Sequence, residues 1–440
     1  MPSFLSSRPS GGPGWRSWLA RTFDSLRGYN FRIWAAGVLV SSVGTWMQRI
    51  AQDWLVLVDL THHSGAAVGV VMSLQFGPPI LLMPLAGAAA DRCERRRLLM
   101  FTQSAMALLA LGLGALTLAG SVSLWEVYAF AGALGCVSSF DSPARQTFVA
   151  ELVGDRGLPN AVALNSTLFN AARLIGPALA GLMIAAVGTG WVFVANALSY
   201  LGVIAALARM RGEELQPVPR AGAGSAGIAQ GFRYLGGQPE LVVALSMLFL
   251  VGTYGLNFPI FIATMSVRTF AGGPGLYGAL SSAMAVGAVA GGLLVAGRKR
   301  PHLVSLRLSA LAFGVVCGLA ALMPGVWSFA LCLALLGVLA QVFTTSTNSL
   351  VQLSTEGAMR GRVMAIYMGI FLGCTPLGAP LVGWIADAFG PRWALAVGAA
   401  SGLAAAALAT WYLRRAKRRR VAAAAVDAAS RSPGACPPCA

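Results

Sequence analysis

Charged residues are scarce in this 440-residue chain: Asp, Glu, Lys and Arg together make up 11% of it, against about 25% in a typical soluble domain. Lysine occurs only at Lys299 and Lys417, and the chain has three histidines. Hydrophobic residues, by contrast, make up 57% of the sequence. Such a composition excludes a disordered chain and an ordinary soluble globular enzyme, and it indicates a membrane protein.

Enzyme signatures are also missing from the sequence. It contains no P-loop, HExxH pair or GxSxG elbow, so we expect no enzyme activity, no bound metal and no direct use of ATP. Five of the seven cysteines stand singly in apolar surroundings, which is not the spacing of a disulfide framework. Cys436 and Cys439 lie in a tail that we interpret as unstructured and reduced, with a redox or metal role as the alternative. Residues 1–27 lack the apolar core of a signal peptide.

Apolar stretches long enough to cross a bilayer recur along the whole chain. One span needs about 20 apolar residues, and the sequence predicts twelve, at 31–57, 65–89, 98–119, 123–143, 161–187, 191–209, 240–263, 275–297, 304–323, 326–349, 363–387 and 392–413. The resulting organisation is an N-terminal tail (1–30), a six-helix bundle (31–209), a linker (210–239), a second six-helix bundle (240–413) and a basic C-terminal tail (414–440).

The net charge of +17 follows from the placement of Arg and Lys. With a cytosolic amino terminus, 28 of the 32 Lys and Arg residues fall in cytosolic segments, Arg268 and Arg392 fall outside, and Arg49 and Arg173 lie within spans. This distribution obeys the positive-inside rule, so we expect a multi-pass protein of the inner (plasma) membrane with both termini in the cytosol. No nucleic-acid-binding motif accompanies the basic residues, so no nucleic-acid partner is expected. The Arg414–Arg420 cluster suggests a contact with anionic lipid.

An internal repeat relates the two halves of the chain. The segment Gly176-Pro-Ala-Leu-Ala-Gly181 in the fifth predicted span matches Gly378-Ala-Pro-Leu-Val-Gly383 in the eleventh, 202 residues later. The same offset pairs Gly188 with Gly390 and places further identical residues in register. A fifth span that matches an eleventh indicates a parallel duplication of six helices, which is how many transporters build a cleft between two halves.

The loop after the second predicted span carries a distinctive motif, Gly87-Ala-Ala-Ala-Asp91-Arg92-Cys93-Glu94-Arg95-Arg96. Gly87 permits a close approach of two helices, and Asp91 can lie against the positive amino end of another helix. The motif resembles the GxxxDRxGRR signature of the major facilitator superfamily, with Glu94 in place of the second glycine. The resemblance implies that Asp91 meets the eleventh span, near Arg362, and that the cluster biases which side of the transporter is open. We assign this conformational switch to Gly87, Asp91, Arg92, Arg95, Arg96 and Arg145, with Arg145 as a partner of Asp91; a simple basic loop is the alternative.

A longer stretch is similar to the enterobactin-exporter-like branch of that superfamily. It comprises Phe140-Asp-Ser-Pro-Ala-Arg-Gln-Thr-Phe148, Leu158-Pro-Asn-Ala161 and Asn170 through Gly181, with further agreement at Gly44-Thr-Trp-Met-Gln48, Arg360-Gly-Arg-Val-Met364 and Pro376-Leu-Gly378. The resemblance implies proton-driven export of siderophores, macrolides or other small amphipathic compounds, and it marks Gly176, Pro177 and Gly181 as an exporter-type helix bend. Independently, Pro177 removes a backbone donor within a helix, so a kink is expected there.

Ionisable residues within spans are candidates for function because they are costly in a bilayer. Arg49 and Asp53 lie one helical turn apart on a polar face of the first span, and Asp141 lies at the cytosolic end of the fourth. Asp53 is the preferred proton carrier, with Arg49 and Asp141 as further proton-coupling candidates. The alternative for Arg49 and Asp53 is a purely structural ion pair.

Polar residues on the same and other spans are candidates for the lining of a substrate cavity. Arg173 could hold an anionic or catechol-like group, or it could instead pair with Asp141 or Asp53. For the neutral residues of the second half, Tyr254, Asn257, Gln341 and Thr345, a helix–helix hydrogen bond is the alternative. The full set of candidates is Gln48, Gln52, Asn170, Arg173, Tyr254, Asn257, Gln341 and Thr345.

Taken together, the sequence predicts an all-α membrane protein of twelve transmembrane helices, arranged as two six-helix parallel pseudo-repeats in the major facilitator fold. We expect a secondary active transporter that exports small amphipathic compounds by proton antiport and alternating access, as a monomer in the lipid bilayer and without any cofactor besides the proton gradient. A nutrient importer or facilitator of the same fold is the alternative, and a membrane-embedded enzyme or scaffold is a remote one.

Overall fold

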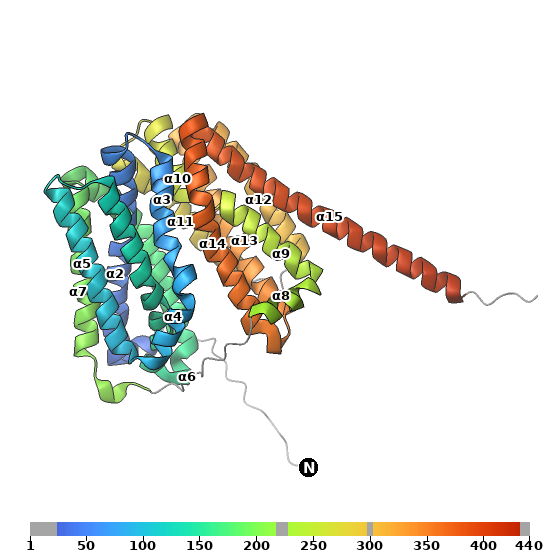
Figure 1. Cartoon of the computed structure of the whole chain (residues 1–440), viewed down its shortest axis with the longest axis horizontal. Helices are drawn as coiled ribbons and strands as arrows, with labels where there is room; N and C mark the ends of the chain where they lie inside the picture. The colour runs from blue at the N-terminus through green and yellow to red at the C-terminus, as the bar shows by residue number, and fades with distance from the viewer. Residues whose placement is uncertain (1–23, 217–227, 297–301, 432–440) are drawn as a thin grey trace, which may run out of the picture. The chain divides into compact units, whose positions relative to one another are not determined.

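The computed structural model describes residues 24–216, 228–296 and 302–431 (Figure 1). Within these ranges the side chains of Ala90, Asp91, Asp155, Arg156, Ile228, Ala296, Ala358 and residues 419–431 are not described. The expected N-terminal tail up to residue 23, part of the expected linker and the Cys436–Cys439 pair lie outside the described residues.

All regular structure within the described ranges is helical. The longer helices are α2 (Tyr29–Trp54), α3 (Gly65–Phe76), α4 (Pro78–Arg92), α5 (Arg95–Leu118), α6 (Leu124–Val187), α7 (Thr189–Arg209), α9 (Pro239–Tyr254), α11 (Pro274–Ala296), α12 (Leu303–Leu322), α13 (Val326–Ser354), α14 (Gly357–Phe389) and α15 (Pro391–Arg431). The short ones are η1 (Asp24–Arg27), η2 (Leu55–Leu60), η3 (Gly212–Glu214), α8 (Ile228–Gly236), α10 (Phe258–Thr264) and η4 (Met265–Thr269).

Ten helical stretches of the described residues are long and apolar enough to cross a membrane. The two remaining predicted spans are α2 and the first part of α6, which carry ionisable residues such as Asp53 and Asp141. These two helices complete the twelve spans of the fold. The backbone of Gly154, at φ 65° and ψ 179°, leaves the helical region and divides α6 into two spans.

Several predicted spans differ from the structure in their continuity and their ends. The second is divided into α3 and α4 next to Pro78, and the seventh into α9 and α10 at residues 255–257. The first and the seventh each continue into a π-helical turn, η2 and η4. The twelfth span was expected to end at residue 413, but α15 continues as a helix to Arg431.

The backbone supports the internal repeat. Gly188 precedes α7 with φ 88° and ψ 170°, and Gly390 precedes α15 with φ 101° and ψ 160°. Positive φ is favourable for glycine and strained for other residues, so both halves make the same glycine-dependent turn, 202 residues apart. The structure therefore agrees with a parallel duplication of six helices.

Contacts divide the chain into two compact units, each described here by itself. Unit 1 comprises Met1–Ala51, Leu82–Val122 and Cys136–Ala223, and unit 2 comprises Gln52–Leu81, Ser123–Gly135 and Gly224–Ala440. In unit 1, α5 packs against α7, and buried apolar residues of α2, α6 and α7 form a core around Trp34, Phe148 and Leu207. In unit 2 the extensive helix pairs are α11 with α13, α12 with α15, and α3 with α14.

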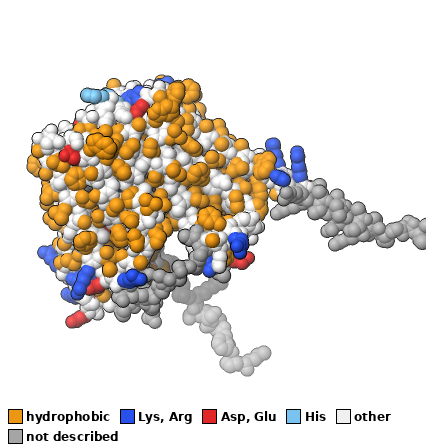
Figure 2. Space-filling model, in the orientation of Figure 1, with side chains coloured by type: hydrophobic (Ala, Val, Ile, Leu, Met, Phe, Trp, Pro, Cys, Tyr) orange, Lys and Arg blue, Asp and Glu red, His pale blue; other side chains and the backbone are white. Residues whose placement is uncertain are grey.

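Large apolar side chains cover the sides of the helices, while most of the visible Lys and Arg side chains lie at their ends (Figure 2). Trp327 is 87% exposed, and Leu81 and Trp125 are each 80% exposed. Exposed apolar surface on this scale marks an interface, and for helices of this length and hydropathy that interface is the hydrocarbon core of a membrane.

Candidate functional site

Asp53 lies near the end of α2, with only 7% of its surface exposed, and contacts a tyrosine that the sequence analysis did not single out. The hydroxyl of Tyr277, in α11, donates a hydrogen bond of 2.8 Å to Oδ2 of Asp53. Tyr277 is fully buried. Both residues belong to unit 2, so a carboxylate from the first half of the sequence is bonded by a hydroxyl from the second half.

The two glutamines expected to line a cavity are buried in this structure. Gln48 accepts a hydrogen bond of 2.5 Å from the amide nitrogen of Asn196 in α7, and Gln52 accepts one of 3.0 Å from Gln75 in α3. Nε2 of Gln52 is buried without a hydrogen-bond partner among the described residues. Both side chains therefore link helices within their own unit, and their role in lining a cavity stays a prediction.

Two arginines flank one indole ring within unit 1. The guanidinium carbon of Arg49 lies 4.8 Å from the centre of the Trp46 ring, and that of Arg173 lies 5.8 Å from it. Phe169 packs edge-on against the same ring, at 5.9 Å between ring centres. Arg173 thus lies beside Trp46. Among the described residues it forms an ion pair neither with Asp141 nor with Asp53. Cation–π contacts of this kind hold a guanidinium group in place without neutralising its charge.

The expected helix bend at Gly176 and Pro177 is a place of close helix contact. A Cβ atom on Gly176 would lie 2.5 Å from Cβ of Trp46 and 3.1 Å from the carbonyl oxygen of Val43. Any larger residue would push α6 away from α2, and the Trp46 ring with it. α6 remains helical through Pro177, because Gly154 is the residue within it with non-helical dihedrals; Gly181 is buried further along the same helix. The kink expected at Pro177 therefore stays a prediction, and the break at Gly154 is a separate feature that divides the fourth span from the fifth.

Asp141 is held by four hydrogen bonds within unit 1. It accepts from Thr102 Oγ1 at 2.8 Å, from Gln103 Nε2 at 2.7 Å, and from Nε and Nη2 of Arg145 at 3.1 and 2.9 Å. Arg145 thus forms an ion pair with Asp141, one turn earlier on α6. Its expected pairing with Asp91 stays a prediction, because the Asp91 side chain is not described. These bonds join Asp141 to α5 and to the next turn of α6, and its role in proton coupling stays a prediction.

The residues of the predicted conformational switch have separate surroundings in unit 1. Arg95 is buried and forms an ion pair with Glu151, while Arg96 donates to the carbonyl oxygens of Leu207 and Ala208 at the end of α7. Arg92 is exposed, and the side chain of Asp91 lies outside the described residues. A Cβ atom on Gly87 would meet no described atom within 4 Å, so the expected close helix approach at Gly87 is not seen in this structure.

The seventh span is interrupted beside the polar residues that the sequence singled out there. Asn257 is fully buried at the break and donates to the carbonyl oxygen of Thr253 at 2.7 Å, while its Oδ1 atom has no partner among the described residues. A Cβ atom on Gly378 of α14 would lie 1.7 Å from that same carbonyl oxygen. Tyr254 is half-buried. Discontinuous helices of this kind form binding sites in many transporters.

The two candidates on α13 interact with each other. Nε2 of Gln341 donates a hydrogen bond of 3.0 Å to Oγ1 of Thr345, one turn further along the helix. Asn170 likewise donates to the carbonyl oxygen of Ser166 on its own helix. These contacts do not test a binding role, so the roles of Gln341, Thr345 and Asn170 in the substrate cavity stay predictions.

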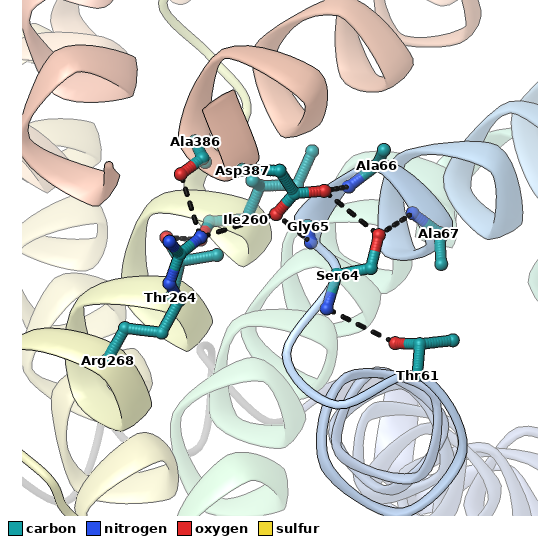
Figure 3. A network of polar contacts seen from close by, with 10 residues as sticks. All are labelled: Thr61, Ser64, Gly65, Ala66, Ala67, Ile260, Thr264, Arg268, Ala386 and Asp387. Atoms are coloured by element: carbon teal, nitrogen blue, oxygen red, sulfur yellow. Dashed lines mark hydrogen bonds and ion pairs between the residues drawn. The ribbon is translucent and has the colours of Figure 1, made fainter. Parts of the chain in front are cut away.

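An acidic residue missed by the sequence analysis caps a helix from the other half of the chain, within unit 2 (Figure 3). Oδ1 of Asp387 accepts the backbone N–H of Gly65 at 2.7 Å, and Oδ2 accepts the N–H of Ala66 and the hydroxyl of Ser64, each at 2.9 Å. Ser64 is the N-cap of α3, and its hydroxyl also accepts from Ala67. The first N–H groups of a helix have no acceptors within the helix, and here the Asp387 carboxylate accepts two of their hydrogen bonds.

Arg268 of η4 completes the arrangement, which we call the Asp387 cluster (Ser64, Gly65, Ala66, Arg268 and Asp387). One nitrogen of Arg268 donates to the carbonyl oxygen of Ala386 at 2.8 Å and lies 3.4 Å from Oδ1 of Asp387. A carboxylate in the last turn of α14 faces the negative end of its own helix dipole, which is unfavourable. Arg268 and the amino end of α3 compensate for that position.

Small residues bring α3 and α14 together along their antiparallel contact. A Cβ atom on Gly383 would lie 2.2 Å from the carbonyl oxygen of Gly65, and one on Gly69 would lie 2.4 Å from that of Ala379. Further along, the Ser73 hydroxyl donates to the carbonyl oxygen of Pro376 at 2.9 Å. That carbonyl has no partner on its own helix, because the residue four positions later is Pro380. Two runs of small residues four apart are typical of closely packed transmembrane helices.

The missed residues differ in the signal they leave in the sequence. Tyr277 leaves none, because nothing in its own span indicates a distant carboxylate. Asp387 follows Gly383 by four positions, which is the spacing of Gly87 and Asp91 in the switch motif. This shared GxxxD pattern at the ends of two helices could have directed attention to Asp387.

Comparisons with known proteins agree with this architecture. The model of the transmembrane secretion effector family, within the major facilitator superfamily, matches residues 20–434. A staphyloferrin A transporter of Staphylococcus aureus is 26% identical over 79% of this chain and 87% of the relative. The multidrug efflux pump Tap of Mycolicibacterium fortuitum is 28% identical over 80% of this chain and 88% of the relative. The enterobactin exporter EntS of Shigella flexneri is 28% identical over 74% of this chain and 78% of the relative.

Solved structures show the same fold. A bacterial homologue of the lysosomal transporter Spinster, in an inward-facing and unoccupied conformation, superposes with a TM-score of 0.65, at 15% identity over 87% of this chain and 95% of the other. A D-xylose–proton symporter gives a TM-score of 0.65 at 14% identity, over 87% of this chain and 96% of the other. The predicted fold and the predicted resemblance to exporters are both confirmed. The chain is a multi-pass membrane transporter, not an enzyme, and it belongs to the transmembrane secretion effector family of the major facilitator superfamily.

Proposed function

We propose that this protein exports small amphipathic compounds, such as siderophores or antibiotics, from the cytosol by proton antiport and alternating access. Three relatives that cover most of the chain are named for the transport of a siderophore or of drugs, and two of them are named as exporting it. The proposal places the arginine-rich loops in the cytosol, following the positive-inside rule, so that the Asp387 cluster lies at the outer end of the helices.

The observation that carries the coupling proposal is the bond between Asp53 and Tyr277. A nearly buried carboxylate within a membrane protein is costly unless it is paired or can take up a proton. Its partner hydroxyl comes from the second half of the sequence, so protonation of Asp53 changes a contact between segments from both halves. Proton uptake from outside can thereby be converted into a change of conformation.

The Asp387 cluster supplies a physical basis for one of the alternating states. It joins α3, from the first half of the sequence, to α14, from the second, through a charge at a helix terminus and a close backbone contact. We propose that the cluster closes the outer end of the transport pathway, and that the GxxxD motif at Asp91 serves the cytosolic end in the opposite state. Alternation then consists of exchanging one helix cap for the other.

Arg49, Trp46 and Arg173 provide the basis for recognising cargo. Two guanidinium groups on one indole ring form a positive and flat surface within unit 1. Among the described ion pairs of this unit, Asp141, Glu151 and Glu94 each pair with an arginine other than Arg173. We propose that an anionic or catechol-like part of the cargo lies against this surface, because Arg groups bind such oxygens in bidentate fashion and stack on aromatic rings.

The proposal is tested by substrate accumulation in everted membrane vesicles that carry the protein, driven by an imposed proton gradient. A fluorescent dye or labelled siderophore should accumulate with the normal chain, and Asp53→Asn should abolish gradient-driven accumulation. Asp59→Asn is the matched control, since this exposed carboxylate lies six positions later in η2 and its loss should leave transport unchanged. An uncoupler should stop transport, whereas removal of ATP should not.

Two outcomes would contradict the proposal. Gradient-driven export that persists with Asp53→Asn would exclude Asp53 as the proton carrier. Accumulation in right-side-out vesicles, with none in everted ones, would show import and favour a nutrient transporter of the same fold.

A further inference from the structure

A groove of about 840 Å³ is lined by residues of the packed helices α12 and α15 in unit 2. It is lined by Arg307, Leu308, Leu311, Leu403, Ala406, Ala407, Thr410, Trp411, Arg414, Arg415 and Arg418. This volume lies in the range of sites that bind small organic ligands. The groove is remote in sequence from the residues proposed above for protons and cargo, so it requires an explanation of its own.

One end of the groove carries four arginines and no acidic residue. Arg307 comes from the first turns of α12, and the other three follow one another along α15. Within the described part of the chain, no carboxylate forms an ion pair with any of the four. Like charges gathered in one groove repel each other, so the arrangement favours a ligand with negative charge.

The other end of the groove is apolar and open. Leu308 is 53% exposed, and Leu311 and Leu403 are also exposed. Ala407 lies beside them on α15 and is exposed as well. These side chains belong to helices that qualify as membrane spans, so their exposed surface faces hydrocarbon. A ligand of this groove therefore has an apolar part in addition to its charge.

The polar and apolar parts are ordered along the helix axes. Leu403 precedes Arg414 by 11 positions, which is about 16 Å along α15. Trp411 lies between them, with 57% of its surface exposed, and the Arg415 guanidinium lies 5.4 Å from the centre of its ring. Trp residues are enriched at the level of lipid headgroups. The groove lining brings Arg307, near the start of α12, together with the three arginines of α15, so the arginines of both helices meet at the same end.

We propose that this groove binds an anionic phospholipid, with its phosphate on Arg307, Arg414, Arg415 and Arg418 and an acyl chain along Leu308, Leu311 and Leu403. Arginine is well suited to phosphate because its planar group donates two parallel hydrogen bonds. The apolar half of the groove distinguishes a lipid from inorganic phosphate or a nucleic acid, which would leave the leucines uncovered. The site requires neither transport nor proton coupling, so it can be tested apart from them.

The experiment measures thermal unfolding and lipid retention in native mass spectrometry, for the full chain in a mild neutral detergent. Phosphatidylglycerol should raise the unfolding temperature and remain bound, whereas phosphatidylcholine should do neither. The triple variant Arg307→Gln, Arg414→Gln and Arg415→Gln should weaken phosphatidylglycerol binding by about fivefold for each arginine removed. The matched control removes three exposed arginines outside the groove, Arg32→Gln, Arg209→Gln and Arg233→Gln, and should bind as the normal chain does.

A second variant tests the apolar half without a change in charge. Ala407→Phe should fill part of the groove and reduce phosphatidylglycerol retention while all four arginines remain. Glycerol phosphate, which carries the headgroup charge without acyl chains, should bind far more weakly than the lipid. The proposal is overturned if neither variant changes retention, if phosphatidylcholine binds equally well, or if glycerol phosphate binds as tightly as phosphatidylglycerol.

Discussion

The carboxylate of Asp387 accepts the backbone N–H of Gly65 at 2.7 Å, so the last turn of α14 supplies the negative charge that caps the first turn of α3. The adjacent glycines allow this contact, because a Cβ atom on Gly383 would overlap the carbonyl oxygen of Gly65. A cap that joins two separate helices differs from one within a helix: it is lost whenever the helices separate. It therefore contributes to the stability of only one conformation.

Replacing the charge tests this interpretation. Asp387→Asn keeps the size of the side chain but removes the charge from the amino end of α3, where helix capping and the helix dipole together contribute about 1–2 kcal/mol. We expect the population with the outer ends of α3 and α14 apart to rise about tenfold. Spin labels at exposed positions near these ends, on His63→Cys and Phe389→Cys in a background without native cysteines, would report longer distances.

The matched control for this measurement is Asp59→Asn, which removes an exposed carboxylate near the same end of α3 but outside the cluster. Its distance distribution should equal that of the normal chain. If Asp387→Asn also leaves the distribution unchanged, the Asp387 cluster is a structural cap and does not control closure.

The proposed coupling makes a separate prediction about Tyr277. Tyr277→Phe keeps the buried ring and removes the hydroxyl that donates to Asp53. The ionised carboxylate loses a stabilising hydrogen bond, so protonation becomes easier and the pH profile of export should move to higher pH, by about one unit. Dye efflux from vesicles, measured over a series of external pH values, provides the profile.

Tyr128→Phe is a suitable control, because the Tyr128 ring packs edge-on against Trp125 and lies outside the Asp53 contact. If Tyr128→Phe shifted the pH profile by the same amount, the effect of Tyr277→Phe would reflect a general perturbation of the protein and not the contact with Asp53. An unchanged profile with Tyr277→Phe would remove Tyr277 from the coupling mechanism.

The sequence was sufficient to predict the helices, the duplication and the family, because each depends on a pattern along the chain. Runs of apolar residues locate spans, and the shared offset of Gly188 and Gly390 reflects a turn that depends on positive φ. Asp53 could also be identified as a candidate from the sequence, because a carboxylate within an apolar span is energetically costly and therefore rare.

Contacts between distant helices could not be predicted in the same way. Tyr277 is an ordinary residue in its own span, and only the packing of α11 brings its hydroxyl to Asp53. Arg145 was expected to pair with Asp91, whose side chain is not described, and the structure shows its ion pair with Asp141, four residues earlier on α6. The polar residues of α2 were expected to face a cavity, and the hydrogen bonds of Gln48 and Gln52 to α7 and α3 could not be predicted from their own span.

The surface formed by Trp46, Arg49 and Arg173 leads to a prediction about the charge of the cargo. Each guanidinium group contacts the indole ring, and a cation–π contact orients such a group without neutralising its charge. An anionic cargo gains from both groups, whereas a cationic cargo is repelled by them. The two arginines should therefore influence selectivity more than the overall rate of transport.

Arg173→Gln removes one of these charges and keeps a polar side chain of similar length. We expect export of a carboxylate siderophore to fall by at least tenfold, because a buried charge-assisted hydrogen bond contributes about 1.5–3 kcal/mol, while export of the cationic dye ethidium is retained or increased. Both cargoes are measured in everted vesicles at equal protein levels. Arg392→Gln is the control, since this exposed arginine lies at the start of α15. An equal loss for both cargoes would indicate that Arg173 supports the structure of α6 and does not select the cargo.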